Sequence, residues 1–419
     1  MRALLEESFR AAVGAADPLR ILGAHLPGPP RGRTFVAAAG KAAASMAAAV
    51  ESHWPAGAPL QGMAITRYGH GLPLRRIRMV EAGHPLPDEA GESAAKEILR
   101  SAKQLGKDDL LLALISGGGS SLLSLPAEGV PIAEMKSLTV QLLRSGAPIQ
   151  DINTVRKHLS AIQGGRLAAA CGAPVLALII SDVTGDDPTH IASGPCAPDP
   201  TTYRDAREIL GRYRISPPQA IAARLEKAED ETPKPGDALF ERVENRVVAT
   251  AQRSLEAAAA VFRSSGVEPV ILGDTITGEA AEVAKVFAAI ARQIRAHGTP
   301  FKPPVALISG GECTVTIRGE GGRGGRCSEF LLALALAAAE VPGLSAIAAD
   351  TDGIDGSQDN AGALLYPDSL SRAAARRLDA KALLAHNDSY GFFAGLGDLL
   401  VTGPTRTNVN DYRAMVLQK

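Results

Sequence analysis

The chain has 419 residues, of which 46% are hydrophobic and 21% are charged, so it is long enough for two domains and apolar enough to bury a large core. Lys and Arg total 44 and Asp and Glu total 45, which gives a net charge of −1. This balance argues against a nucleic-acid-binding protein, which needs a basic face, and it gives no reason to expect binding to anionic lipid.

No apolar run approaches the roughly 20 residues of a membrane span. Glu6, Glu7 and Arg10 leave no room for an uncharged secretory core near the start of the chain. The four cysteines are scattered, with no C-x-x-C pair. This usage is typical of free thiols in a reducing compartment, without a structural zinc site. We therefore expect a cytoplasmic protein with neither a membrane nor a nucleic acid as partner.

In the first half of the chain, short apolar runs that end in Gly, Ser or Asp alternate with Ala-rich stretches. The pattern predicts a strand over 34–39, a helix over 42–53, a strand over 77–81, a helix over 88–104, and buried strands over 110–115 and 175–180. We expect Asp88 to cap the second of these helices. Continuous apolar strands that alternate with helices indicate a parallel sheet covered on both faces.

The composition changes at residues 227–237, which read KAEDETPKPGD. This charged, proline-containing stretch has little to bury, so we interpret it as the linker between an N-terminal domain of residues 1–232 and a C-terminal domain of residues 233–419. The α/β pattern then restarts. It predicts strands over 245–250, 268–272, 305–308, 314–318, 346–349 and 399–402, and helices over 254–265, 277–297 and 328–340.

The hexapeptide ALISGG occurs twice, at residues 113–118 and at residues 306–311, once in each half. Each copy is a predicted strand that ends in a loop of small residues. Because ligands of open α/β sheets bind at the carboxyl ends of strands, the two loops are candidates for a shared role. The alternative is coincidence in a chain that contains 43 glycines, since glycine also serves in plain turns.

The loop Ser116–Ser121 and the side chain of Lys41 are the first candidates for binding an anion. Glycines let backbone N–H groups approach an anion closely, and the serines of the loop add donors. The alternative is a tight strand–helix turn; the loop is no Walker A motif, because no Gly-Lys-Ser/Thr follows. Lys41 follows Gly40 at a predicted helix start, where the helix dipole disfavours a cation unless an anion is bound. The alternative there is a solvated lysine.

Residues 153–167 read NTVRKHLSAIQGGRL, and we interpret them as one helix and its end, which carries Arg156, Lys157, His158 and Arg166. A solvated basic face is the ordinary explanation for such a charge run. The alternative is binding of an anionic substrate, for which Arg is preferred because its guanidinium group holds a carboxylate through two hydrogen bonds.

Three carboxylates, Asp182, Asp186 and Asp187, follow the predicted strand over 175–180. They repel one another unless a cation lies between them, and carboxylate oxygens suit Mg²⁺. The alternative is an Asx turn or a helix cap, in which the carboxylates accept backbone N–H groups. A second acidic loop, residues 350–355, follows the strand over 346–349.

Residues 319–326 read GEGGRGGR and match G-x-G-x-x-G at Gly319, Gly321 and Gly324. This match is the main support for a dinucleotide-binding protein. It lies late in the chain instead of opening a Rossmann unit, and its glycines are dense enough to fit several registers. Glycines with Arg326 at a helix start suit a phosphoryl or carboxylate group better.

Taken together and in order, these segments resemble those of the glycerate 2-kinase family, whose C-terminal half is the MOFRL domain and some of whose members are labelled hydroxypyruvate reductase. The matching segments are 40–43, 83–88, 116–121, 153–167, 181–187, 192–198, 309–314, 324–329, 350–355, 359–363 and 402–411. In one place the chain departs from the family pattern: Cys327 and Ser328 stand where the family usually has Asn-Gln, while Arg326 and Glu329 are kept. The change makes it uncertain that this turn supplies the family's side-chain contact, but it does not argue against the loop itself.

The resemblance implies ATP-dependent phosphorylation of D-glycerate at its 2-hydroxyl, which gives 2-phosphoglycerate and ADP. It also implies two α/β domains with the active site in the cleft between them: a Rossmann-like parallel-sheet domain first, then a domain that contains the MOFRL region at about residues 300–415. ATP and Mg²⁺ are the implied cofactors, and D-glycerate and ATP are the small-molecule partners. Formation of a homodimer is left open.

Phosphoryl transfer requires positioning of the reactants and neutralisation of charge on the moving phosphoryl group. The resemblance implies that Lys41 and Arg326 face the cleft, where we expect both to act on that charge. We expect Asp187 to be the general base and Mg²⁺ to bind Asp182, Asp186 and Asp187. For the substrate we expect contacts from His84, Ser116, Gly117, Gly118, Ser120 and Arg156. For the nucleotide we expect contacts from Gly310, Gly311, Glu312, Gly325, Asp350, Asp352 and Asn408.

Two other functions use the same features. The glycine pattern at residues 319–324 and the older family label favour an NAD(P)H-dependent hydroxypyruvate reductase. A non-catalytic protein that senses a phosphorylated or carboxylated metabolite would use the same anion-binding loops. It would have little use for two acidic loops and a Lys/Arg pair supplied by two domains.

Overall fold

A computed structural model describes residues 1–317 and 321–419. Its internal contacts divide the chain into two compact units: a larger unit, Asp17–Val248, and a smaller unit that combines Met1–Ala16 with Ala249–Lys419. The stretch 227–237, which the composition suggested as a linker ending one domain at residue 232, lies inside the larger unit. This stretch is not simply solvated. Thr232 is buried, and the carboxylate of Glu231 accepts hydrogen bonds from backbone N–H groups of the same unit.

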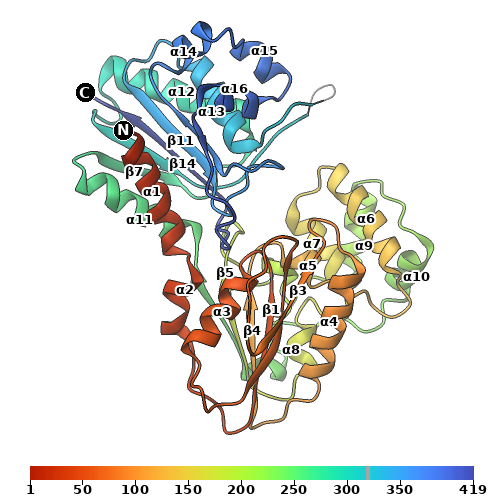
Figure 1. Cartoon of the computed structure of the whole chain (residues 1–419). Coiled ribbons are helices and arrows are strands. Elements are labelled where there is room, and N and C mark those ends of the chain that lie inside the picture. Colours follow the sequence, from red (N-terminus) through yellow and green to blue (C-terminus); the bar gives the residue numbers. More distant parts are fainter. Residues whose placement is uncertain (318–320) are drawn as a thin grey trace. The chain divides into compact units, whose positions relative to one another are not determined.

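The larger unit is built on a six-stranded sheet in the order β3-β2-β1-β4-β5-β6 (Figure 1). Strands β1 to β5 pair in parallel, which places Ala39 of β1 beside Ile115 of β4. The order reverses between β1 and β4, so the predicted Rossmann-like parallel sheet is confirmed. The strands are β1 (Thr34–Ala39), β2 (Leu60–Arg67), β3 (Ile77–Ala82), β4 (Leu110–Ile115), β5 (Val175–Ile180) and β6 (Val243–Ala249).

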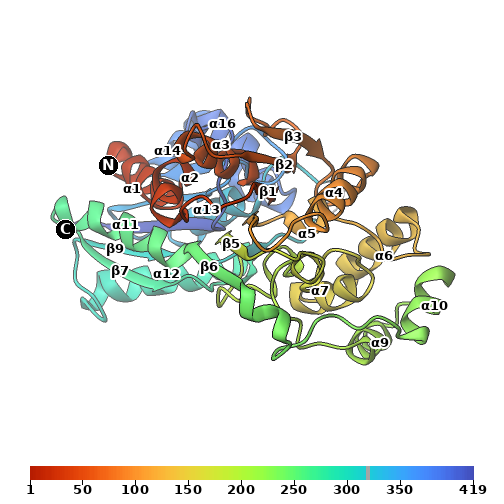
Figure 2. The same ribbon diagram turned by 90° about the horizontal axis from the view of Figure 1, so that it is seen from below.

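Helices cover both faces of this sheet because its central strands are apolar on both sides. Every residue of β1, β4 and β5 is buried. Asp88 caps α4 as predicted, accepting a hydrogen bond from the N–H of Gly91 at 3.0 Å. Helices α6, α7, α9 and α10 form a group at one end of the unit (Figure 2). The helices are α2 (Pro18–Ile21), α3 (Ala43–His53), α4 (Glu89–Ala102), α5 (Gly119–Leu122), α6 (Ile132–Arg144), α7 (Ile149–His158), α8 (Arg166–Ala169), α9 (Tyr203–Arg212) and α10 (Gln219–Lys227).

The smaller unit has a mixed six-stranded sheet in the order β13-β12-β11-β14-β9-β7. Strands β7 and β9 are parallel, and the other neighbours are antiparallel. The strands, together with the short pair β8 and β10, are β7 (Glu268–Gly273), β8 (Gly278–Glu279), β9 (Val305–Ser309), β10 (Cys313–Thr314), β11 (Leu344–Asp350), β12 (Gly362–Leu365), β13 (Leu399–Leu400) and β14 (Asp411–Leu417).

Two helical layers cover this sheet, as the alternation along β11 requires. Ala346 and Ala348 belong to the core under α12 and α13, whereas Ile347 and Ala349 belong to the core under α1 and α11 (Figure 1). The helices are α1 (Arg2–Ala15), α11 (Ala251–Ser264), α12 (Ala280–His297), α13 (Arg326–Ala337), α14 (Ser369–Ala375), α15 (Ala380–Ala385) and α16 (Ser389–Leu396).

Helix α1 thus belongs to the smaller unit although it opens the chain. It is fastened by a hydrogen bond from the Tyr412 hydroxyl to Ser8 Oγ at 2.8 Å and by one from Thr407 Oγ1 to the carbonyl of Ala16 at 2.7 Å. All four cysteines are buried free thiols, as the sequence indicated. Within the described ranges, no helix has the length and apolar character needed to cross a bilayer.

Candidate active site

The carboxyl ends of β1 and β4 meet at the point where the strand order of the larger unit reverses. Here the N–H of Lys41 donates to the carbonyl of Gly117 at 2.8 Å, and the N–H of Ala42 donates to Ser116 Oγ at 3.0 Å. Gly40 is needed at this junction, since its φ is +128° and a Cβ there would collide with Ser116. Ligands of open α/β sheets bind at such a reversal, so this edge of the larger unit is the candidate substrate-binding site.

His84 lies at the same place, although it comes from the segment after β3. Gly118 has a φ of +78°, and a Cβ built on it would lie 2.9 Å from Nε2 of His84 and 3.3 Å from Cγ of Lys41. The predicted residues Lys41, Ser116, Gly117, Gly118 and His84 are therefore brought together. An imidazole, an ammonium group and a glycine-rich loop at one sheet edge form a suitable environment for an anion.

Ser120 takes part in a hydrogen-bond chain that the sequence did not reveal. Its Oγ lies 2.9 Å from Oγ of Ser193, which donates to Oδ1 of Asn153 at 3.0 Å. The amide of Asn153 donates in turn to the carbonyl of His190 at 3.0 Å. Ala192 and Ser193 adopt left-handed φ values of +51° and +59°, which are costly for residues other than glycine. The only sequence signal for this turn was its place in the family-like segment 192–198.

Helix α7 ends at His158, and Arg166 begins the separate helix α8, so the prediction of one helix through residues 153–167 is wrong. The explanation as a solvated basic face also fails, because Lys157 and His158 are fully buried. Helix α7 does not continue past His158, because the Ser160 hydroxyl accepts hydrogen bonds from the backbone N–H groups of Ile162 and Gln163.

Arg156 stands out on α7 because its guanidinium group makes no hydrogen bond or ion pair with any residue in the described part of the chain. Burial lowers the pKa of Arg156 to about 10. A cation that is partly removed from water and has no protein counter-ion is stabilised by a bound anion. Arg156 is thus suited to the carboxylate-binding role that the sequence suggested.

The acidic loop after β5 does not form the expected cage for Mg²⁺. Oδ1 of Asp187 accepts the backbone N–H of Thr189 at 2.8 Å, which is the Asx-turn alternative, and Asp186 adopts a left-handed φ of +55°. Nowhere in residues 1–317 and 321–419 do three His, Cys, Asp or Glu side chains gather as ligands for a metal ion. Asp182, Asp186 and Asp187 therefore do not fit as a joint ligand set, and no step below uses a metal held by them.

In the smaller unit, Arg326 at the start of α13 is held by three carboxylates. Its Nε donates to Oδ1 of Asp411 at 2.7 Å, one terminal nitrogen donates to Oδ2 of Asp350 at 2.7 Å, and the other lies 2.9 Å from Oε1 of Glu312. Burial opposes its charge, but Asp411, Asp350 and Glu312 outweigh this and raise the pKa of Arg326 well above its ordinary value. The side chain remains 22% exposed. Asp411 is a partner that the sequence interpretation did not assign.

The first turn of α13 is capped by the buried carboxylate of Asp355. It accepts the N–H of Cys327 at 2.9 Å, the N–H of Ser328 at 2.8 Å and the Ser328 hydroxyl at 2.6 Å. Burial raises the pKa of Asp355 although these donors favour its charged form. Ser328, at the departure from the family pattern, also lies 2.9 Å from Oγ of Ser389, so its side chain contacts the helix cap and the α16 start within its own unit.

The second ALISGG copy also ends a strand, β9. The N–H of Gly310 donates to the carbonyl of Gly273 at 2.9 Å, and the N–H of Asp411 donates to the carbonyl of Gly311, whose φ is +93°. Asp411 therefore joins Gly311, through its backbone N–H, to Arg326, through its carboxylate. Gly325, the residue before α13, packs against Asp355 so closely that a Cβ would collide with it. Of the predicted nucleotide-binding positions, Glu312 contacts Arg326, Gly311 is joined to it through Asp411, and Gly325 directly precedes it.

Asp352 and Asn408 are almost fully buried and shape their own loops. Oδ1 of Asp352 accepts the N–H of Ile354 at 2.9 Å, and Oδ1 of Asn408 accepts the N–H of Asn410 at 3.4 Å. The two loops are joined, because the N–H of Thr405 donates to the carbonyl of Asp352 at 3.1 Å. These contacts organise the loop that follows Asp350.

The glycine pattern does not open a Rossmann unit. Gly319 lies outside the described residues, while Gly321 and Gly324 precede α13 in irregular backbone. The predicted strand over 314–318 is wrong where it is described: β10 ends at Thr314, and Arg318 lies outside the described ranges. A two-residue strand does not supply the strand–turn–helix unit of a dinucleotide site.

Two family descriptions match the chain: a domain of unknown function, DUF4147, over residues 4–226, and the MOFRL family over residues 305–411. A protein of Agrobacterium vitis, provisionally named hydroxypyruvate reductase, is 50% identical over 99% of this chain and 94% of its own length. A glycerate 2-kinase of Pyrococcus horikoshii is 40% identical over 91% of this chain and 86% of its own.

Solved structures agree with these matches. The crystal structure of glycerate kinase from Thermotoga maritima superposes with a TM-score of 0.87 at 37% identity and covers 99% of both chains. The similarity extends over both units and confirms the resemblance noted in the motifs. The chain belongs to the glycerate 2-kinase family.

Proposed function

We propose that the protein transfers the terminal phosphoryl group of ATP to the 2-hydroxyl of D-glycerate, giving 2-phosphoglycerate and ADP. The observation that carries the proposal is the position of Lys41. Lys41 lies where the strand order of the Rossmann-like sheet reverses, beside His84 and the glycine-rich loop. An ammonium group at this edge of the sheet is suited to neutralise charge on a transferred phosphoryl group.

The substrate carboxylate is assigned to Arg156, supported by Ser116, Gly117, Gly118, Ser120 and His84. The guanidinium group offers a planar pair of donors, and the buried location strengthens its attraction for a carboxylate. Asp187 is the proposed general base for the 2-hydroxyl. Its Oδ1 is used by the backbone of Thr189, so Oδ2 is the atom we assign to the substrate proton.

The nucleotide is assigned to Gly310, Gly311, Glu312, Gly325, Asp350, Asp352 and Asn408. Arg326 stabilises charge on the transferred phosphoryl group together with Lys41. Because three carboxylates already share the charge of Arg326, a bare triphosphate would be repelled from this place. We therefore propose the magnesium complex of ATP, and not free ATP, as the phosphoryl donor.

The test is an assay that couples ADP release to a colour change, run with D-glycerate, L-glycerate and other hydroxy acids. The expected result is ADP formation with D-glycerate that disappears when Mg²⁺ is chelated. The relatives provisionally named hydroxypyruvate reductase favour one second candidate, an NAD(P)H-dependent reductase. Oxidation of NADH or NADPH by hydroxypyruvate, without ADP formation from ATP and D-glycerate, would replace the kinase proposal by that activity.

A further inference from the structure

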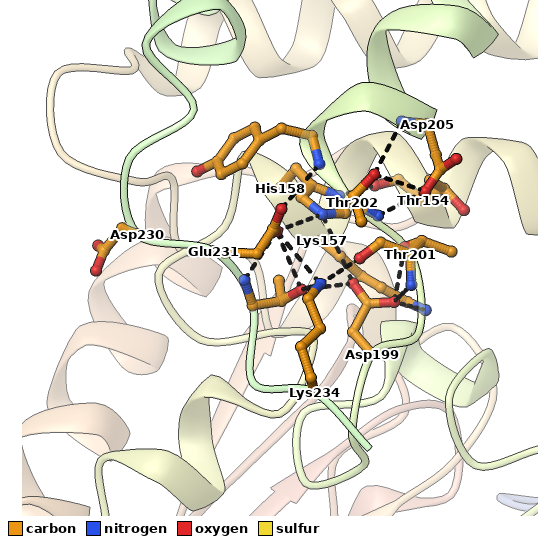
Figure 3. Close-up of polar contacts among 12 residues, drawn as sticks. Thr154, Lys157, His158, Asp199, Thr201, Thr202, Asp205, Asp230, Glu231 and Lys234 are labelled. Carbon is orange, nitrogen blue, oxygen red and sulfur yellow. Dashed lines mark hydrogen bonds and ion pairs between the residues drawn. The ribbon is translucent and has the colours of Figure 1, made fainter. Parts of the chain in front are cut away.

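The two residues that follow Arg156 on α7, Lys157 and His158, belong to a cluster of charged and hydroxyl side chains in the larger unit that the proposed reaction does not use (Figure 3). We call it the α7 clamp. It joins the last turn of α7, the segment before α9 and the charged stretch after α10. Its members are Lys157, His158, Asp199, Thr201, Glu231, Thr232 and Lys234.

The centre of the clamp is an ion pair from which water is excluded. Nζ of Lys157 donates to Oδ1 of Asp199 at 3.2 Å, and both side chains are 0% exposed. Asp199 also accepts the N–H and hydroxyl of Thr201, at 3.1 and 2.7 Å, and the hydroxyl of Thr232 at 3.1 Å. Burial acts to raise the pKa of Asp199, but Lys157 and the Thr201 donors outweigh it and hold the pKa below its ordinary value.

The outer half of the clamp ties the stretch after α10 to the same helical turn. Nδ1 of His158 donates to the carbonyl of Thr154 at 2.8 Å, and its Nε2 lies 2.9 Å from Oε1 of Glu231. Glu231 accepts the N–H of Thr232 at 3.0 Å, and Nζ of Lys234 donates to the Thr232 hydroxyl at 2.8 Å. Two segments far apart in the sequence, the one before α9 and the one after α10, therefore meet on two neighbouring residues of α7.

Stability alone does not account for this arrangement. Burying two charges costs free energy that their attraction repays only in part, and a well-packed apolar pair of similar volume often stabilises a fold equally or better. The same helix already packs through Ile152, Val155 and Leu159 into an apolar core. Apolar packing tolerates small shifts, whereas a pair of directed charges in a dry interior fixes distance and rotation.

We propose that Lys157 and Asp199 are positioning residues for Arg156. The pair fixes the turn of α7 that carries Arg156, one residue before Lys157, and Asn153, which belongs to the Ser120–Ser193 hydrogen-bond chain. Misplacement of a bound reactant by about 1 Å can lower the reaction rate up to about 100-fold. An ion pair that fixes the position of Arg156 therefore matters for binding the substrate carboxylate. The inference rests on the assignment of Arg156 to D-glycerate under the proposed function.

The decisive variant replaces both charges by apolar side chains of similar size, Lys157→Met with Asp199→Leu. It removes the lock without leaving a buried unpaired charge. We expect a folded protein whose thermal midpoint is lowered, because the donors of Thr201 and Thr232 lose their acceptor. We also expect a KM for D-glycerate raised about 10-fold and an unchanged KM for ATP. A wild-type KM for D-glycerate in the folded double variant would show that the pair serves stability only, and would overturn the proposal.

A smaller change guards against misfolding of the double variant. Thr232→Val keeps the shape of a side chain that is 2% exposed and removes its hydrogen bonds to Asp199 and from Lys234. It should raise the KM for D-glycerate about threefold, the effect of half a hydrogen-bond energy. Arg212→Ala is the matched control, because Arg212 of α9 is 61% exposed and pairs with Asp151 of α7. A KM that responds equally to Arg212→Ala and Thr232→Val would overturn the proposal.

A double-mutant cycle separates this inference from the proposed function. If the pair acts through Arg156, then Lys157→Met with Asp199→Leu should have no further effect on the KM in an Arg156→Ala background. Independent, multiplicative effects would overturn the positioning role while leaving the kinase intact. Absence of D-glycerate phosphorylation by the wild type would refute the proposed function itself, and is seen before any variant is made.

Discussion

Asp411 binds Nε of Arg326 through Oδ1 at 2.7 Å, and its backbone N–H donates to the carbonyl of Gly311 at 3.1 Å. The residue therefore links the glycine turn after β9 to the arginine at the start of α13. Both belong to the proposed nucleotide end of the site. Asp411 lies at the start of β14, opposite Asp350 in the register of β11 and β14, so the sheet itself fixes the separation of two carboxylates that hold Arg326.

Asp411→Asn should lower kcat more than it raises the KM for ATP. The amide keeps the shape but loses the charge that orients Arg326, and an oriented cation acts mainly on the transition state. We expect kcat to fall at least about 10-fold. Steady-state kinetics with saturating D-glycerate measures the effect.

The matched control is Asp398→Asn, which alters another almost buried carboxylate of the same unit, paired with Arg372 at 2.5 Å. It should lower the thermal midpoint without changing kcat. An equal loss of kcat in both variants would contradict the assignment of Asp411 to the site.

Gly118→Ala should weaken binding of D-glycerate. The new methyl group would lie 2.9 Å from Nε2 of His84 and 3.3 Å from Cγ of Lys41, in backbone with a φ of +78°. Gly129→Ala is the matched control, because its φ is +81° and nothing lies within 4 Å of the added methyl. Both variants should lose about 1–2 kcal/mol of unfolding free energy, but only Gly118→Ala should change the KM. Calorimetry and kinetics on the same preparations decide this.

Ser193 offers a test of the hydrogen-bond chain to Ser120. Ser193→Ala and Ser193→Gly both remove the hydroxyl, and glycine also relieves the left-handed φ of +59°. We expect both to raise the KM for D-glycerate by a similar factor, while the glycine variant is more stable by about 1 kcal/mol. If the KM rises in the less stable alanine variant only, the hydrogen bonds from Ser193 do not act on binding of D-glycerate.

The buried pair of the α7 clamp gives a pH dependence with a defined sign. The pKa of Asp199 is lower in the folded chain than its ordinary value of 3.8, so the folded state binds fewer protons in that range. Its contribution to stability is fully present above pH 3.8 and is lost as the pH falls through the folded-state pKa. At neutral pH, Asp199→Asn should lose about 3–5 kcal/mol of unfolding free energy, as for a broken buried pair.

That difference between wild type and Asp199→Asn should shrink as the pH is lowered from about 5 to about 2. Urea unfolding of both proteins across this range measures it. A difference that stays constant over this range would mean that the pKa of Asp199 is the same in the folded and the unfolded chain, so that its charge does not stabilise the fold.

The sequence predicted the central strands well because their apolar runs are long and end in clear turn signals. The bounds of β1, β4 and β5 match the predicted ones, and Asp88 caps α4 as expected. Strand β14 was not predicted, because DYRAMVL contains an arginine. That arginine, Arg413, is buried and donates to the carbonyl of Gly310, a long-range contact that local pattern does not reveal.

The same limit applies to the site. Small-residue loops at strand ends pointed to Lys41, Ser116 and Gly118, which the structure places together, since turn chemistry is local. The charged segments were interpreted as solvated or as a linker, because burial of Lys157 with Asp199 depends on a partner 42 positions away. The acidic loop after β5 suggested a metal for the same reason: composition shows carboxylates, but not that Asp187 turns back onto the N–H of Thr189.

The central claim is the transfer of a phosphoryl group to the 2-hydroxyl of D-glycerate, and phosphorus NMR of the product tests it most directly. The 2-hydroxyl sits on a carbon with one hydrogen, so the expected product shows a phosphorus doublet, together with one equivalent of ADP. A triplet would place the phosphoryl group on the terminal carbon and contradict the claim. So would a reaction mixture in which ATP and D-glycerate remain unchanged while hydroxypyruvate is reduced.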